Sequence, residues 1–173
     1  MDPVLDGRIA ACRTCRGGDP DHARSAFGRS VAEAVFWTPA AVLRSPSVVW
    51  EAVSNNAARV TVSHHGLAQS VDVTVAADGQ PTKLVFQRWS NANPEQEYHL
   101  QPFGGYLSSF QDFQGYRLPN NVEAGNHFGT EAYFPFYRVN VTEISFPQEI
   151  HQGASTVPLI FLKRQAARRA NVI

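Results

Sequence analysis

The sequence predicts an α+β fold: a strongly curved antiparallel β-sheet of about seven or eight strands, shaped as a half-barrel and packed around one N-terminal helix. Two patterns predict it. Near the N-terminus, apolar residues recur at helical spacing, whereas nearly everything from residue 47 to residue 146 alternates as strands do. Turn residues separate these strands at short intervals, which is typical of an antiparallel meander. A sheet of this kind buries a single helix most economically by curving around it.

The helical stretch begins after a break at residues 17–20, "GGDP". Asp21 is expected to cap this helix, because a carboxylate accepts hydrogen bonds from the free N–H groups of a first turn. Pro39 interrupts the helix, and "PAAVL" is predicted to resume as a short helical turn with Pro39 at its first position, where no N–H is needed. One face of the helix comprises Phe27, Val31, Ala34, Val35 and Thr38.

The strand region begins with "SVVWEAV" and continues with two alternating runs, "ARVTVSHH" and "LAQSVDVTVA", which are separated near Gly66. Asp78-Gly79 is a strong hairpin signal, after which "TKLVFQRW" returns as the next strand. The run "EYHLQPFGGYLSSFQDF" is predicted to form two strands bent at Gly104 and Gly105. "QGYRLPNNVEA" and "FYRVNVTEISF" supply the last strands.

We expect the chain to have three parts: a flexible N-terminal segment at 1–20, a domain of helix and curved sheet at 21–147, and a basic tail at 148–173. The tail contains "KRQAARR", with four positive charges. We interpret it as a solvated tail. The alternative is a basic amphipathic helix that makes a weak membrane-surface contact.

Composition limits the classes of function. The 173 residues include 15 basic and 15 acidic side chains, so no overall electrostatic field favours nucleic acid as a partner. No apolar run approaches the roughly 20 residues that span a bilayer. The N-terminal residues also lack a basic segment followed by an apolar one, which a signal peptide requires. The sequence therefore predicts a cytoplasmic protein without a nucleic-acid partner.

No motif for catalysis, cofactor binding or metal binding is present. Cys12 and Cys15 have no second pair of ligands that would complete a zinc site. His64 and His65 abut Gly66, and successive strand residues point to opposite faces, so we expect an exposed turn here rather than a metal site. The chain also lacks a nucleophile elbow, a phosphate loop and a dinucleotide fingerprint. The sequence predicts no catalytic residue, no cofactor and no metal.

Residues 124–138, "AGNHFGTEAYFPFYR", concentrate five aromatic rings. If residues 131–138 are extended, Tyr133 and Tyr137 share one face of the strand and Phe134 and Phe136 share the other. Rings bring large area and defined shape, so this segment is either packing for a curved sheet or the wall of a pocket for an apolar ligand.

Four ionisable residues, Glu33, Glu51, Arg88 and Arg138, could serve the same pocket. Glu33 lies beside the apolar face of the helix, while Arg88 and Arg138 each adjoin an aromatic residue, so stacking and carboxylate pairing are both available to them. A buried Glu–Arg pair would be structural, or it would hold a ligand's polar head or act as acid and base. The predicted ligand-binding residues are Glu33, Trp37, Trp50, Arg88, Tyr106, Phe128, Phe134, Phe136 and Arg138.

Two stretches, "VAEAVFWTPAAVL…VVWEAV" and "QPFGG…GYRLP…EAGNHFGTEAYFPFYR", resemble an uncharacterised bacterial family of unknown function of the DUF6544/DUF6920 type. The resemblance covers about residues 28–147 and the C-terminal part of typical relatives. It implies the half-barrel of lipoprotein-carrier-like proteins and no established activity. A partial sheet would expose an edge and apolar surface, which favours a homo-oligomer. The matching positions are Glu33, Trp37, Pro39, Trp50, Glu51, Arg88, Pro119, Phe136 and Arg138.

Three functions follow from these patterns. We favour a binding module that holds a hydrophobic or lipid-like small molecule in a cup between helix and sheet. A structural or assembly protein would instead use its aromatic face for self-association or for a partner chain. A small acid–base enzyme acting on an apolar substrate would require at least two ionisable groups that converge in a cavity.

Overall fold

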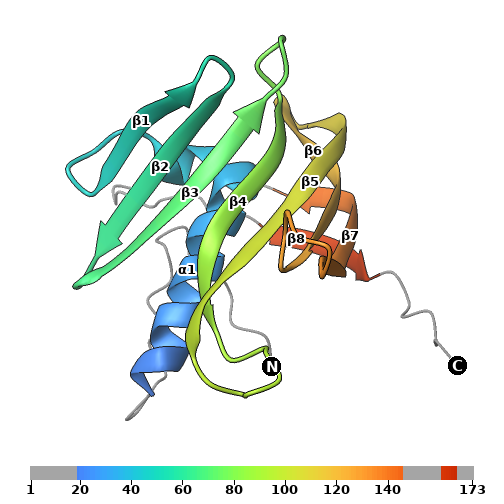
Figure 1. Ribbon diagram of the computed structural model, residues 1–173. Coiled ribbons are helices and arrows are strands. Elements are labelled where there is room, and N and C mark those ends of the chain that lie inside the picture. Colours follow the sequence, from blue (N-terminus) through green and yellow to red (C-terminus); the bar gives the residue numbers. More distant parts are fainter. Residues whose placement is uncertain (1–18, 146–160, 167–173) are drawn as a thin grey trace, which may run out of the picture.

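The computed structural model describes residues 19–145 and 161–166, and Figure 1 shows the arrangement of their elements. This part of the chain forms one α-helix, one short 3₁₀ helix and eight strands in a single antiparallel sheet, so the predicted α+β class is confirmed. The strands lie in the sheet in the order of the sequence, from β1 at one edge to β8 at the other. The elements are α1 (Pro20–Trp37), η1 (Pro39–Val42), β1 (Val48–Ser54), β2 (Ala57–His64), β3 (Leu67–Val75), β4 (Pro81–Ser90), β5 (His99–Phe113), β6 (Tyr116–Asn126), β7 (Phe134–Ser145) and β8 (Phe161–Ala166).

The helix starts two residues earlier than its predicted cap. Asp19, not Asp21, is the N-cap residue, and its side chain accepts a hydrogen bond of 2.9 Å from the Asp21 backbone N–H. Pro20 occupies the first turn, where its missing N–H costs nothing. The predicted second turn is confirmed as η1, which begins at Pro39.

The core lies between α1 and one face of the sheet. Val31 of the helix is fully buried, and so are Val60 of β2 and Val71 of β3. Val60 and Val71 are cross-strand partners, so their side chains lie side by side on the helix-facing side of the sheet. The helix contacts β3, β4 and β6. We call this side of the sheet the inner face and the opposite side the outer face.

The glycine pair in the middle of the meander does not divide a strand. Residues 99–113 form one long strand, β5, and the prediction of two strands bent at Gly104 and Gly105 is wrong. The glycines allow neighbouring groups to approach the strand closely, since a Cβ on Gly104 would lie 2.7 Å from the Phe128 ring. By contrast, Gly79 has φ +83 in the β3–β4 turn, which is the conformation that the predicted Asp-Gly hairpin requires.

The sheet is split between β3 and β4. Their ladder covers only Asp72–Val75 of β3, while the preceding residues 67–71 pair with β2 alone. Beyond the ladder the two strands diverge, and α1 is visible through the opening in Figure 1. The Gln69 side chain bridges this opening, since its Nε2 donates to the Gln87 backbone carbonyl at 3.3 Å.

The C-terminal end of the sheet contains a bulge and an added strand. The register of β6 and β7 shifts between Ala124 and Gly125, so a glycine lies at this irregularity. Residues 161–166 form β8, paired antiparallel to β7. The amphipathic helix considered for the tail is therefore wrong for these residues. The N-terminal segment 1–18, with Cys12 and Cys15, and the rest of the tail lie outside the described residues.

Candidate functional site

An apolar groove of about 650 Å³ lies on the inner face, between the C-terminal end of the helical region and the ends of the strands at the β1–β2 and β3–β4 turns. Its floor is formed by inward-facing residues of β1, β2 and β3, and its wall by α1 and η1. Its rim carries the polar residues of the β1–β2 turn. The lining residues are Val35, Pro39, Val42, Leu43, Arg44, Trp50, Ala52, Ser54, Asn55, Asn56, Ala57, Ala58, Val73, Val75 and Pro81.

Small side chains create the hollow. Ala52 and Ala58 are cross-strand partners, and Ala58 is also the partner of Val73. Three adjacent strands thus present two methyl groups and one isopropyl group to the inner face at one level. Further along the sheet the same face carries Val60 and Val71, which are completely buried. The groove is therefore the part of the inner face that neither the helix nor large side chains fill.

Trp50 fixes the wall of the groove. Its indole Nε1–H donates to the Val42 backbone carbonyl at 2.8 Å, which ties η1 to β1 across the groove's end. The bond also gives a partner to a carbonyl at the end of a short helix. The aromatic ring can then present its face to an apolar ligand while its only polar atom is satisfied.

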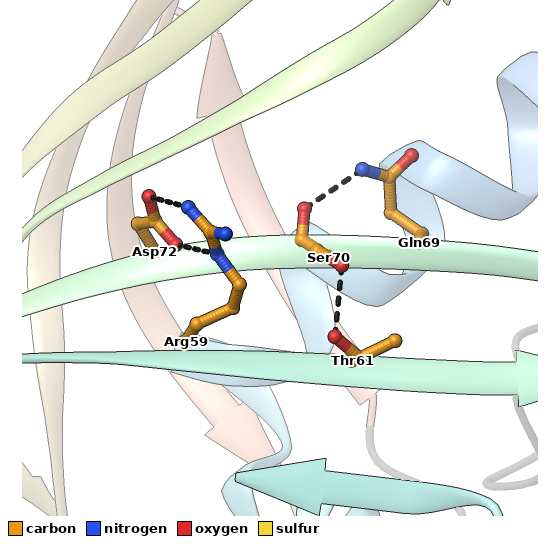
Figure 2. A network of polar contacts seen from close by, with 5 residues as sticks. All are labelled: Arg59, Thr61, Gln69, Ser70 and Asp72. Atoms are coloured by element: carbon orange, nitrogen blue, oxygen red, sulfur yellow. Dashed lines mark hydrogen bonds and ion pairs between the residues drawn. The ribbon is translucent and has the colours of Figure 1, made fainter. Parts of the chain in front are cut away.

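A second, polar hollow of about 340 Å³ lies at the split between β3 and β4. Figure 2 shows four of its lining residues, Arg59, Gln69, Ser70 and Asp72, together with the neighbouring Thr61. Arg59 and Asp72 form a two-pronged ion pair, with Nε–Oδ1 at 2.6 Å and Nη2–Oδ2 at 2.9 Å. The hydroxyls of Thr61 and Ser70 share a hydrogen bond of 2.8 Å. Each polar group drawn there already has a protein partner.

Of the predicted site residues, only Trp50 lines the groove. Glu33 forms an ion pair with Arg29, one helical turn away, at 3.3 Å. Trp37 is almost completely buried, and its Nε1 has no hydrogen-bond partner among the described residues. The groove is therefore lined mostly by residues that the sequence did not single out.

Arg88 lies on the inner face at the far end of β4 from the groove. It is two residues beyond buried Phe86 on the same side of the strand, directly across from Gln101 of β5. Its guanidinium stacks over the Phe103 ring, with Cζ 5.2 Å from the centroid. Burial lowers the pKa of Arg88, and the positive charge of Arg29 lowers it further.

Tyr106 and Phe128 belong to a different cluster, on the outer face. The loop after β6 folds back over β5 and places Phe128 between Tyr106 and Tyr133, at centroid distances of 5.2 and 5.1 Å. Arg138 pairs with Glu123 beside them at 3.0 Å. Burial raises the pKa of Tyr133, and the Glu123 carboxylate raises it further.

Phe134 and Phe136 lie on the inner face. The centroid of the Phe136 ring lies 6.0 Å from that of Phe103 and 6.5 Å from that of Phe134. Both remain at least half exposed. The bulge in β6–β7 breaks simple alternation, so Tyr137 packs against the inner core while Tyr133 joins the outer cluster. The prediction that these two tyrosines share a face is wrong.

The described residues contain no group of three or more His, Cys, Asp or Glu side chains that could hold a metal ion. His64 and His65 are exposed at the β2–β3 turn, as predicted, with His65 at φ 47. Glu33 and Arg138 lie on opposite sides of the sheet, each in its own ion pair. The convergence that an acid–base enzyme requires is therefore not observed for these two residues. Among residues 19–145 and 161–166, no helix has the length and apolar character needed to cross a bilayer.

The sequence profile of a family of unknown function, DUF6544, matches residues 5–139. The chain belongs to the DUF6544 family. The match begins and ends closer to the N-terminus than the predicted resemblance, which covered about residues 28–147. It includes every position on which the resemblance was based, from Glu33 to Arg138. No curated protein and no solved structure matches this DUF6544 chain.

The groove residues of this DUF6544 chain were missed because large aromatic side chains were taken as the sign of a pocket. The signal that could have found them is a pair of alanines at facing positions in two adjacent strands, Ala52 and Ala58. Their neighbours in the same alternation, Trp50 and Val60, are large. A local loss of volume on a core-facing stripe predicts a hollow.

Proposed function

We propose that this DUF6544 chain binds an apolar, uncharged small molecule in the groove between α1, η1 and strands β1 to β3. In this proposal the sheet serves as the wall of a half-barrel, a cup that curves around the helix. The observation that carries the proposal is a hollow of about 650 Å³ lined mostly by apolar side chains, beside a tryptophan whose N–H is already satisfied.

The dimensions and the chemistry of the groove both support this. Pockets for small molecules typically have volumes of about 300–1,000 Å³, mainly apolar walls and a few polar groups that set orientation. Here the floor and walls are Ala, Val, Pro, Leu and Trp side chains, and polar side chains such as Arg44 and Asn55 lie at the rim. A ligand would therefore bury its apolar part and direct any hydroxyl group toward the rim.

Nile red fluorescence in the full chain, with dodecanol as the competitor, tests this function. The key variant is Ala58→Phe, which places a ring on the groove floor. We expect it to weaken probe binding at least about tenfold, since it removes most of the contact area for a ligand. The matched control is Ala92→Phe, the same substitution at an exposed residue in the β4–β5 connection.

Two outcomes would contradict the proposal. One is equal probe binding by the Ala58→Phe variant and the wild type, with urea unfolding showing that both are folded. The other is native mass spectrometry that finds no apolar molecule on the purified chain together with no displacement of the probe by dodecanol. Either result would move the function away from the groove.

Self-association is the second candidate, and two exposed side chains on an edge strand favour it. Val49 and Val53 of β1 point to the outer face and are each about half exposed, at 48% and 51%. An edge strand with exposed β-branched residues can pair with another chain. Sizing by light scattering separates the candidates, because a monomer at micromolar concentration leaves only the binding function.

A further inference from the structure

A donor and an acceptor without partners among the described residues lie on two paired residues of the inner face, away from the groove. The Nε of Arg88 and the Oε1 of Gln101 are both buried, and neither has a hydrogen-bond partner among the described residues. The two residues are cross-strand partners in β4 and β5. Gln101 is only 3% exposed, and its Nε2 donates to the Ser90 carbonyl at 2.6 Å. This bond fixes the side-chain amide in an orientation in which its oxygen accepts no hydrogen bond from the described residues.

The donor of this pair, Arg88, is a charged side chain without an ion-pair partner in the described part of the chain. Arg29, Arg59 and Arg138 each form an ion pair with a carboxylate. Arg88 forms none within the part of the chain that the structure describes, and Phe103 is its ring contact. Partly buried cations are normally paired or bound to an anion. The site is therefore suited to an anionic oxygen from outside the described residues.

An apolar strip leads away from the charge. The Phe103 ring lies under the Arg88 guanidinium and contacts Phe136, which in turn stacks on Phe134. The outer two rings are 50% and 65% exposed. A molecule whose head reached Arg88 could thus lay an apolar chain along three rings on the same side of the sheet.

We propose that Arg88 and Gln101 bind the head of an amphiphilic anion, which offers a negatively charged oxygen to Arg88 and an N–H or O–H donor to Gln101, while its apolar chain lies on Phe103, Phe136 and Phe134. The proposal does not depend on the groove, which lies at the other end of β4. The ligand class differs too: the groove suits an uncharged apolar molecule, whereas this site selects for charge. A ligand with a carboxylate and a neighbouring amide N–H can accept from the Arg88 Nε–H and donate to the Gln101 Oε1.

The test uses N-dodecanoylglycine, which carries an apolar chain, an amide N–H and a carboxylate. Binding to the full chain is measured by equilibrium dialysis below the micelle concentration. Two analogues separate the contributions: the methyl ester lacks the charge, and dodecanoate lacks the amide N–H. We expect the ester to bind at least about tenfold more weakly, the usual effect of losing a hydrogen bond to a charged group, and dodecanoate to bind several-fold more weakly.

Variants locate the site. Arg88→Met should weaken N-dodecanoylglycine binding at least about tenfold. Arg138→Met removes the same charge from the outer face and should leave binding within about twofold of wild type. Ala58→Phe, which fills the groove, should also leave it unchanged.

Three results would overturn the proposal. The first is equal binding of N-dodecanoylglycine and its methyl ester by the wild type. This result does not depend on the folding of any variant. The second is undiminished binding by Arg88→Met. The third is loss of N-dodecanoylglycine binding in Ala58→Phe, since this would place the amphiphile in the groove instead.

Discussion

Replacing Arg88 with methionine should stabilise the ligand-free protein. Methionine keeps an unbranched apolar stem of similar length, so it can still pack on Phe103. It removes a charge and an N–H that has no partner among the described residues. Most substitutions at partly buried positions destabilise a protein. An increase in stability on losing an arginine is therefore a distinctive result.

The size of the effect follows from opposing contributions. Leaving a buried donor unsatisfied costs about 1–3 kcal/mol, and the Arg88 guanidinium is only partly buried, so the lower half of that range applies. The like charge of Arg29 adds to the cost, in agreement with the lowered pKa of Arg88. Against this, the contact with the Phe103 ring is worth about 0.5–1 kcal/mol. The net expectation is that Arg88→Met raises the free energy of unfolding by roughly 0.5–1 kcal/mol.

Urea unfolding of the ligand-free chain, followed by tryptophan fluorescence, measures this. The midpoint should rise with an unchanged m-value, because the surface exposed on unfolding stays the same. Arg88→Lys keeps the charge and should not gain stability. Arg138→Met is the surface control and should change the free energy of unfolding by no more than about 1 kcal/mol. A loss of more than about 1 kcal/mol in Arg88→Met, at constant m, would show that Arg88 contributes to the fold and would refute the reasoning.

Three further predictions concern other parts of the sheet. Gly104→Ala should lower the free energy of unfolding by about 1–3 kcal/mol, because its Cβ would overlap the Phe128 ring and a backbone carbonyl of β4; truncating Phe128 to alanine should relieve only part of that cost in urea unfolding. The pKa of Tyr133 is raised in the folded state, so stability should fall as the pH rises above about 10, and Tyr133→Phe should remove this part of the fall in pH-dependent unfolding. Trp50→Phe should cost roughly 1–2 kcal/mol and weaken Nile red binding, because the Val42 carbonyl loses its partner and η1 its attachment to β1.

The helix and most strands could be predicted because their side-chain periodicity has a direct physical cause. Val31 and Val35 lie one turn apart on the buried face of α1, and Val60 and Val62 alternate into the core from β2. Helical spacing of 3.6 residues and strand spacing of two residues are local properties, so one sequence suffices to show them. The N-cap was predicted at Asp21, two residues after the observed cap, Asp19. The choice between two nearby aspartates depends on local geometry that periodicity does not show.

The error over β5 has a tertiary cause. Gly104 and Gly105 were interpreted as a bend because glycine weakens a strand. In the structure they lie in a continuous strand, and their missing side chains make room for Phe128 and for the neighbouring Ala124. Phe128 follows Gly104 by 24 residues, and no local pattern reveals that its ring will fold back onto β5. Close approach by a distant residue looks the same in a sequence as a bend.

The ligand-binding cup stays a prediction, and the residues proposed for it are mostly elsewhere. The structure has an apolar groove between the helical region and the sheet, but the aromatic segment that suggested a pocket does not line this groove. Trp50 is shared between prediction and structure. For Arg88 both aromatic stacking and carboxylate pairing were expected to be available; the structure shows stacking on Phe103, and the described residues give Arg88 no carboxylate partner. Pairings of this kind depend on which strands become neighbours, and the sequence alone does not specify the register.

Both candidate sites lie where the inner face departs from the pattern that builds a core. Over the middle of the sheet, valines, leucines and phenylalanines meet α1 and are buried. At one end alanines replace them and leave a hollow. At the other end Arg88 and Gln101 replace them, and the Arg88 Nε and the Gln101 Oε1 have no partner within residues 19–145 and 161–166. Each departure costs stability, and positions that break a local rule without compensation are the expected locations of function. The buried core separates the two ends, so we expect the two sites to bind separate ligand molecules. One neutral and one anionic ligand should bind to the same chain at the same time, without competing.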